Sequence, residues 1–93
     1  MTEHREDNAL AESLSLHVEV DEGVVYYFNS DNQQHRVHGP AVIRQDGTRF
    51  WMQRGELHRV DGPAVEWSDG DTHWYLYGKM VSEDEFNEQI QFL

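Results

Sequence analysis

Three of the six histidines lie in a stretch of the chain where they could bind a metal ion or transfer a proton. His35 and His38 are three residues apart, and His58 follows in the next part of the chain. Imidazole nitrogens bind metals and act as general bases near neutral pH. A zinc site needs three or four ligands at characteristic spacings, whereas His35-x-x-His38 has no second pair unless His58 and Asp61 converge on it. We therefore expect no metal and no cofactor, and keep a metal or small-ligand site on these histidines as an alternative.

The histidines belong to a stretch that occurs twice. Residues 35–42 read HRVHGPAV and residues 58–65 read HRVDGPAV, so a shift of 23 residues leaves one difference, His38 against Asp61. A catalytic centre is a single asymmetric group, whereas a side chain that recurs in each copy is expected to serve packing. We expect each imidazole to hydrogen-bond a backbone carbonyl and each arginine to pair with an acid of a neighbouring unit. The predicted structural residues are His35, Arg36, Gly39, Pro40, His58, Arg59, Gly62 and Pro63.

The remaining sequence lacks the usual catalytic motifs. It has no cysteine, no serine in a nucleophile elbow and no glycine-rich phosphate loop. Acidic side chains are so numerous that no single pair indicates acid–base catalysis. The sequence therefore predicts a protein that is not an enzyme.

The elements that position these residues are predicted to be β-hairpins. The repeat extends to residues 28–47 over residues 51–70, and a truncated third copy covers 74–82. Asp-Gly between apolar stretches is a strong hairpin signal because both turn positions tolerate positive φ. Asn32, Gly55 and Gly78 supply a second turn at equal spacing. The predicted fold is mainly β, an antiparallel meander of repeated β-hairpins with about six to eight short strands.

The C-terminus changes to a helical pattern. Ser82 and Glu85 have the spacing of a capping box, and Phe86, Ile90 and Leu93 share one helical face. One C-terminal α-helix is therefore expected to cap the sheet. We divide the chain into an acidic, flexible N-terminal segment (1–14), a β-hairpin repeat domain (15–81) and a C-terminal capping helix (82–93).

The net charge of −11 is unevenly distributed. Residues 1–22 and 66–93 each carry −6, whereas residues 23–65 carry +1. Such a negative field favours a basic protein partner and opposes direct binding of nucleic acid or an anionic membrane. No apolar run approaches the ~20 residues that span a bilayer, and the absence of cysteine fits the cytoplasm.

Specificity is expected where the two copies differ, because packing does not dictate those positions. Ile43 becomes Glu66, Arg44 becomes Trp67 and Arg54 becomes Tyr77, so the second copy is more acidic and aromatic. Aromatic residues anchor protein interfaces, and acids steer a basic partner towards them. The predicted partner-binding residues are Glu66, Trp67, Asp69, Asp71, Tyr75, Tyr77, Glu83, Asp84, Glu85 and Glu88. The alternative is that Trp67 and Tyr75 belong to the core and that the acids only form a solvated face.

The pattern G-x-L-H-R-x-x-G-P-A-V-x-x-x-D-G-x-x-x-W, which runs from Gly55 to Trp74, resembles the short hairpin repeats of small phage and prophage proteins. These repeats are distantly similar to MORN repeats, and the resemblance covers about residues 26–81. The first copy departs from the pattern at Asn32 and Gln34, and the third has Val81-Ser82 in place of His-Arg.

The resemblance implies a phage-encoded inhibitor of the anti-CRISPR or anti-restriction kind. Such a protein would mimic nucleic acid and occlude a basic surface of a nucleic-acid-handling complex in the host cytoplasm. Two alternatives stay open: a structural or assembly module that self-associates as a homodimer, and the metal or small-ligand binder described above.

Overall fold

The computed structural model describes residues 11–12 and 14–93. The prediction of a flexible segment over 1–14 lies outside the described part for residues 1–10 and 13. Residues 11–12 and 14–15 are helical and lead into the first strand.

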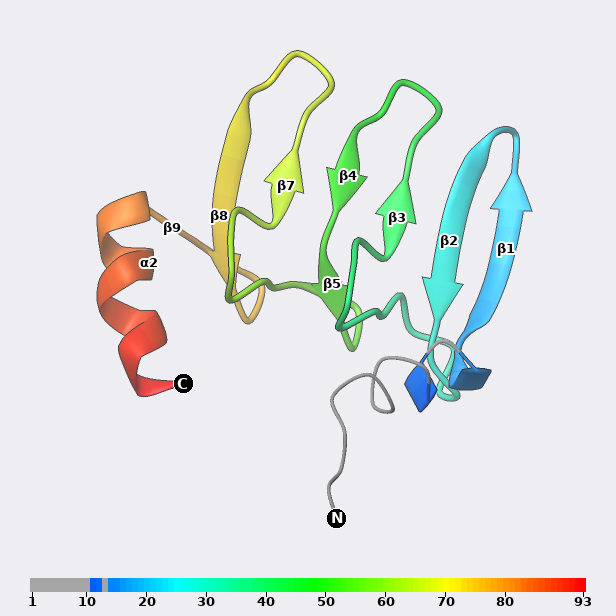
Figure 1. Cartoon of the computed structure of the whole chain (residues 1–93), viewed down its shortest axis with the longest axis horizontal. Coiled ribbons are helices and arrows are strands. Elements are labelled where there is room, and N and C mark those ends of the chain that lie inside the picture. Colours follow the sequence, from blue (N-terminus) through cyan, green and yellow to red (C-terminus); the bar gives the residue numbers. More distant parts are fainter. Residues whose placement is uncertain (1–10, 13) are drawn as a thin grey trace.

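The fold is mainly antiparallel β with one C-terminal α-helix, as predicted. Seven strands form one sheet in the order β1-β2-β3-β4-β7-β8-β9, and β5 and β6 pair with each other. Figure 1 shows the hairpins β1–β2, β3–β4 and β7–β8 side by side, with α2 at the opposite end of the row from β1. The strands are β1 (His17–Asp21), β2 (Val24–Phe28), β3 (Val42–Ile43), β4 (Arg49–Phe50), β5 (Met52–Gln53), β6 (Glu56–Leu57), β7 (Val65–Glu66), β8 (Thr72–Leu76) and β9 (Lys79–Val81).

The described chain has nine strands, more than the six to eight predicted. The difference arises after β4, where the chain does not continue one long strand. Met52 and Gln53 instead pair with Leu57 and Glu56 in a small ladder of their own. The short hairpin β5–β6 therefore lies outside the seven-stranded sheet, and at the corresponding place of the first copy there is only the isolated bridge between Phe28 and Gln34.

The two kinds of turn have different geometries, which corrects the predicted reason for the Asp-Gly turns. Gly47 and Gly70 have φ of 94°, but Asp46 and Asp69 are not among the positive-φ residues. The N–H of Gly47 donates to the carbonyl of Arg44 at 3.0 Å, which closes a three-residue loop with glycine in the left-handed position. The turns with positive φ at both central residues are Glu22-Gly23, Arg54-Gly55 and Tyr77-Gly78.

The first short turn is one residue longer than its counterpart. Residues 29–33 lie between the bridge partners Phe28 and Gln34, whereas residues 53–56 lie between Met52 and Leu57. The Asn29 side chain fills the longer loop, because its Oδ1 accepts the N–H groups of Asp31 and Gln33. As a result Tyr27, and not Phe28, occupies the place of Trp51. The prediction that aligned residue 28 with residue 51 is wrong by one position there.

The buried core is small and follows the line where neighbouring hairpins meet. Ala41 and Ala64, which immediately precede β3 and β7, are completely buried. Thr48 is also completely buried, and its Oγ1 accepts the N–H of Ser68 from the next hairpin at 3.1 Å. The other buried residues are Val42, Trp51, His58, Val65, Leu76, Val81 and Phe86.

Helix α2 (Glu83–Gln89) covers the last strands. The predicted capping box is confirmed: Ser82 Oγ accepts the N–H of Glu85, and the Glu85 carboxylate accepts the N–H of Ser82. Phe86 is 2% exposed and packs against Leu76 and Val81. Leu93 was expected on the same face but is exposed, because the chain tightens into the 3₁₀-helix η1 (Ile90–Phe92) before reaching it.

Candidate functional site

The repeated histidines connect each unit to the turn of the next. The N–H of Arg54 donates to His35 Nδ1 at 2.9 Å, and the N–H of Tyr77 donates to His58 Nδ1 at the same distance. Both donors are the first residue of a positive-φ turn. The expectation that the imidazole bonds a carbonyl is therefore wrong: the ring accepts an amide proton, because the tight turn leaves its N–H groups without a partner inside the hairpin.

The following residue of each turn makes an equivalent bond. Gly55 donates its N–H to the carbonyl of Gln34 at 2.9 Å, and Gly78 donates to that of Leu57 at 2.8 Å. Two consecutive amides of each turn thus bind the two residues at the start of the preceding repeat. This paired contact is the physical reason why the histidine stands at the same place in both copies.

His58 is held as a neutral imidazole by its surroundings. The residue is 6% exposed, and its ring lies 4.2 Å from the ring of Tyr77. Burial lowers the pKa of His58, and the nearby Glu56 carboxylate opposes this only in part. A neutral ring with a free lone pair on Nδ1 is the form that the Tyr77 amide requires.

The repeated arginines stack on aromatic rings. The guanidinium carbon of Arg36 lies 4.0 Å from the centre of the Tyr27 ring, and that of Arg59 lies 3.7 Å from the Trp51 ring. Each arginine also donates to the carbonyl of the repeat proline, Pro40 or Pro63, at 3.3 and 3.0 Å.

The glycine before each repeat proline leaves room for that guanidinium. A Cβ atom on Gly39 or Gly62 would stand 2.8 Å from the guanidinium carbon of the arginine three residues earlier. This is closer than carbon atoms pack without strain. The His-Arg-x-x-Gly-Pro pattern therefore encodes a compact loop closed by arginine.

The two arginines differ in their acidic partners. Arg59 pairs with Asp61 at 2.8 Å and with Glu66 at 3.0 Å, while Glu66 also pairs with Arg49 across β4 and β7. Arg36 makes no ion pair with the described residues. Arg59 does pair with acids, but Asp61 and Glu66 belong to its own repeat, so the predicted pairing with a neighbouring unit is wrong for Arg59. Glu66, expected to bind a partner, lies half-buried between two arginines of its own chain.

The other predicted partner-binding residues lie on both sides of the sheet. Trp74 and Leu76 of β8 pack against α2. Tyr75 lies between them in the strand, so its side chain projects from the opposite face of the sheet. Trp67 is 38% exposed with its ring edge-on to Phe50, and Tyr77 is 62% exposed on the short turn. Asp69 and Asp71 are exposed in the β7–β8 loop, and Glu83, Asp84, Glu85 and Glu88 are exposed on α2. Their role in partner binding stays a prediction.

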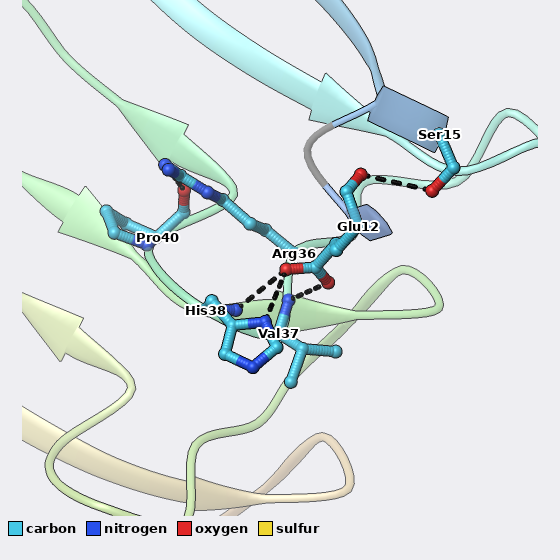
Figure 2. A network of polar contacts seen from close by, with 6 residues as sticks. All are labelled: Glu12, Ser15, Arg36, Val37, His38 and Pro40. Carbon is cyan, nitrogen blue, oxygen red and sulfur yellow. Dashed lines mark hydrogen bonds and ion pairs between the residues drawn. The ribbon is translucent and has the colours of Figure 1, made fainter. Parts of the chain in front are cut away.

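An acidic contact that the sequence did not reveal lies at the first repeat. Figure 2 shows the Glu12 carboxylate facing the loop of Val37 and His38. It accepts the backbone N–H groups of both residues and lies 3.0 Å from His38 Nδ1. The only letter that differs between the two octapeptides, His38, is thus the one whose side chain contacts Glu12; this difference was the available signal.

The bound carboxylate is favoured in its charged form. Burial acts to raise the pKa of Glu12, but the hydrogen bonds from the amides of Val37 and His38, with those from the His38 ring, outweigh it and lower the pKa. In the second copy Asp61 takes the place of His38 and pairs with Arg59 instead. The Glu12 contact is therefore specific to the first unit.

Within residues 11–12 and 14–93, no group of three histidine or acidic side chains is arranged to hold a metal ion. Over the same residues, no helix is long and apolar enough to cross a membrane. Comparison with protein-family models, with curated proteins and with solved structures gave no match.

Proposed function

We propose that this chain is a non-enzymatic, acidic interaction protein that binds a basic protein surface and occludes it. The observation that carries the proposal is the net charge of −11 on 93 residues. Charge of this size attracts basic surfaces and accelerates their association. The sequence resemblance to phage hairpin-repeat proteins suggests the partner class, a host CRISPR effector or restriction complex whose basic site otherwise holds phosphates.

Helix α2 supports the proposal by the placement of its acids. Glu83, Asp84 and Glu88 are exposed, and the last turn of the helix carries no basic residue. Glu85 is committed to the capping box with Ser82. Three carboxylates on a short element that is fixed to the sheet through Phe86 form a rigid negative surface, which costs little ordering entropy on binding.

The test is the salt dependence of binding to a basic effector captured from a bacterial lysate. We expect the affinity to fall as ionic strength rises from about 0.05 to about 0.5 M, because exposed charges are screened over that range. The triple variant Glu83→Gln, Asp84→Asn, Glu88→Gln should weaken binding and flatten this dependence, while the capping box is retained. A salt-independent affinity would contradict nucleic-acid mimicry.

Strand β1 supports a second candidate, self-association into a homodimer. It is an edge strand of the seven-stranded sheet, and all five of its residues are exposed, including Val18 at 47% and Val20 at 68%. An exposed edge offers unpaired backbone groups to another strand. Light scattering over a wide concentration range tests this: a rising mass that Val18→Lys abolishes would support the dimer, and a constant monomer mass would reject it.

A further inference from the structure

The two faces of the sheet differ in what covers them. Residues paired across an antiparallel ladder project to the same side. The pairings Glu19–Tyr26, Tyr26–Val42, Val42–Phe50, Phe50–Val65 and Val65–His73 therefore place one continuous row on one side. We call this side the open face; its row consists of Glu19, Tyr26, Val42, Phe50, Val65 and His73.

The opposite face is covered by groups of the same chain. Tyr27 follows Tyr26 and Trp51 follows Phe50, so both rings project from the side opposite the open face. Arg36 lies over the Tyr27 ring, and Arg59 lies over the Trp51 ring. At the C-terminal end, Phe86 of α2 lies 4.6 Å from the Trp74 ring. The repeat loops and the helix thus cover this side of the sheet. On the open face Val42 and Val65 are themselves buried, whereas Tyr26 and Phe50 are half-buried.

The open face carries a hollow. Its volume is about 280 Å³, and it is lined by Gln34, Val42, Phe50, Met52 and Leu57 from β3 to β6 and the preceding loop. Phe50, Met52 and Leu57 are each half-buried. Trp67 extends the apolar surface, because its indole packs edge-on against Phe50 with the ring centres 5.6 Å apart.

Each end of the row carries a carboxylate beside a histidine. Glu19 Oε2 lies 2.8 Å from His17 Nε2 on β1, and Asp71 Oδ2 lies 3.6 Å from His73 Nε2 at β8. Both carboxylates are well exposed, at 58% and 66%. Arg44, which strand alternation puts on the same side, shares a separate hollow with the acidic side chains of Glu22 and Asp46. The open face is thus apolar in its centre and negative at both ends.

The spacing of the two carboxylates defines the size of a matching ligand. Strands β1 and β8 are five steps apart in the sheet, and each step is about 4.8 Å, so the row spans roughly 24 Å. An α-helix rises about 1.5 Å per residue, and about 16 residues cover this length. A helix laid across the strands would place one apolar stripe along the row and its two ends beside Glu19 and Asp71.

From this geometry we propose that the open face is a docking surface for an amphipathic helix with an apolar stripe and basic residues at both ends. The inference rests on the proposed function in one respect, the basic character of the partner, and adds the face and the shape. Helix-in-groove recognition uses apolar anchors at helical spacing, and the hollow beside Phe50 accepts the central anchor.

A designed peptide of 16 residues provides the test. It carries leucine at i, i+4, i+7 and i+11 with two lysines at each end, and its controls are a peptide with scrambled leucines and one with glutamates in place of the lysines. Binding is followed by NMR of amide and methyl groups of the full chain. We expect the largest shifts at Val42, Met52 and Leu57, and at least tenfold weaker binding by both control peptides.

Variants separate this proposal from the proposed function. Met52→Glu and Glu19→Lys should each weaken peptide binding at least tenfold, whereas Asp84→Lys, with the same charge change as Glu19→Lys but on α2, should change it less than twofold. If Asp84→Lys weakens binding and the shifts lie on α2, the docking face is wrong while the acidic interaction protein stands.

Three other results would also overturn the docking surface. They are equal binding of the scrambled peptide, no binding at all, and concentration-dependent broadening of the open-face signals without peptide. The last result would mean that a second copy of the chain covers this face.

Discussion

The contribution of the stacked arginines can be measured, because the repeat supplies its own control. We predict that Arg59→Ala destabilises the protein more than Arg36→Ala. Both variants lose a guanidinium stacked on an aromatic ring and a hydrogen bond to a proline carbonyl. Only Arg59→Ala also loses an ion pair with the half-buried Glu66.

The magnitudes follow from these contacts. A partly desolvated cation–π contact contributes about 1 kcal/mol, and the hydrogen bond to the carbonyl contributes about 1 kcal/mol. The ion pair adds up to about 1 kcal/mol, because Glu66 keeps Arg49 as a second partner. The pair with Asp61 adds little, since that carboxylate is 80% exposed. We expect losses of about 3 kcal/mol for Arg59→Ala and about 2 kcal/mol for Arg36→Ala.

Urea unfolding followed by tryptophan fluorescence measures both values. A domain of this size is expected to be stable by about 5–14 kcal/mol, so both variants should still fold. Arg59→Lys keeps the charge but loses the planar group, and it should recover no more than the ion-pair part, about 1 kcal/mol. If Arg59→Ala and Arg36→Ala each cost less than about 0.5 kcal/mol, the arginines do not close the repeat loops and the reasoning is refuted.

Three further predictions concern the histidine, the glycine and the acidic contact. Burial lowers the pKa of His58, so below about pH 6.5 the unfolded state binds a proton that the folded state does not. The stability should therefore fall as the pH decreases from about 7 to about 5.5. Urea unfolding midpoints measure this fall, which should be smaller in His58→Gln. Gly62→Ala should cost about 1–3 kcal/mol in thermal unfolding, because the new Cβ displaces Arg59; an unchanged Tm would refute this. Glu12→Gln should speed amide exchange at Val37 and His38. The difference from the wild type should shrink only in acid below the ordinary range of a glutamate carboxyl, because the pKa of Glu12 is lowered. Equal exchange of the two proteins at pH 7 would contradict the contact.

The sequence predicted the fold class because its signals were local. Repeat spacing, glycine turns and the Ser82–Glu85 capping box each depend on a few neighbouring residues. The strand order also follows the chain apart from the β5–β6 hairpin. The sequence did not predict that hairpin or the longer loop at Asn29. The two octapeptides are 23 residues apart, and this spacing gives no sign that the turn before the first one is a residue longer than the turn before the second.

The contacts between units were less predictable, because they depend on which turn approaches which repeat. Nothing in the letters His-Arg indicates that His35 accepts the amide of Arg54, 19 residues later. The capture of Glu12 by the Val37–His38 loop is equally non-local. Strand alternation, in contrast, would have placed Tyr75 and Glu66 on opposite faces had the register been known.

Each repeat histidine accepts a hydrogen bond that joins one unit to the next. NMR of the imidazole nitrogens at neutral pH tests this most directly, through the tautomer and the scalar coupling across an N–H···N hydrogen bond. We expect His35 and His58 both to be protonated on Nε2, with couplings from the amides of Arg54 and Tyr77 to Nδ1. A proton on Nδ1 of either ring, or the absence of both couplings, would contradict it.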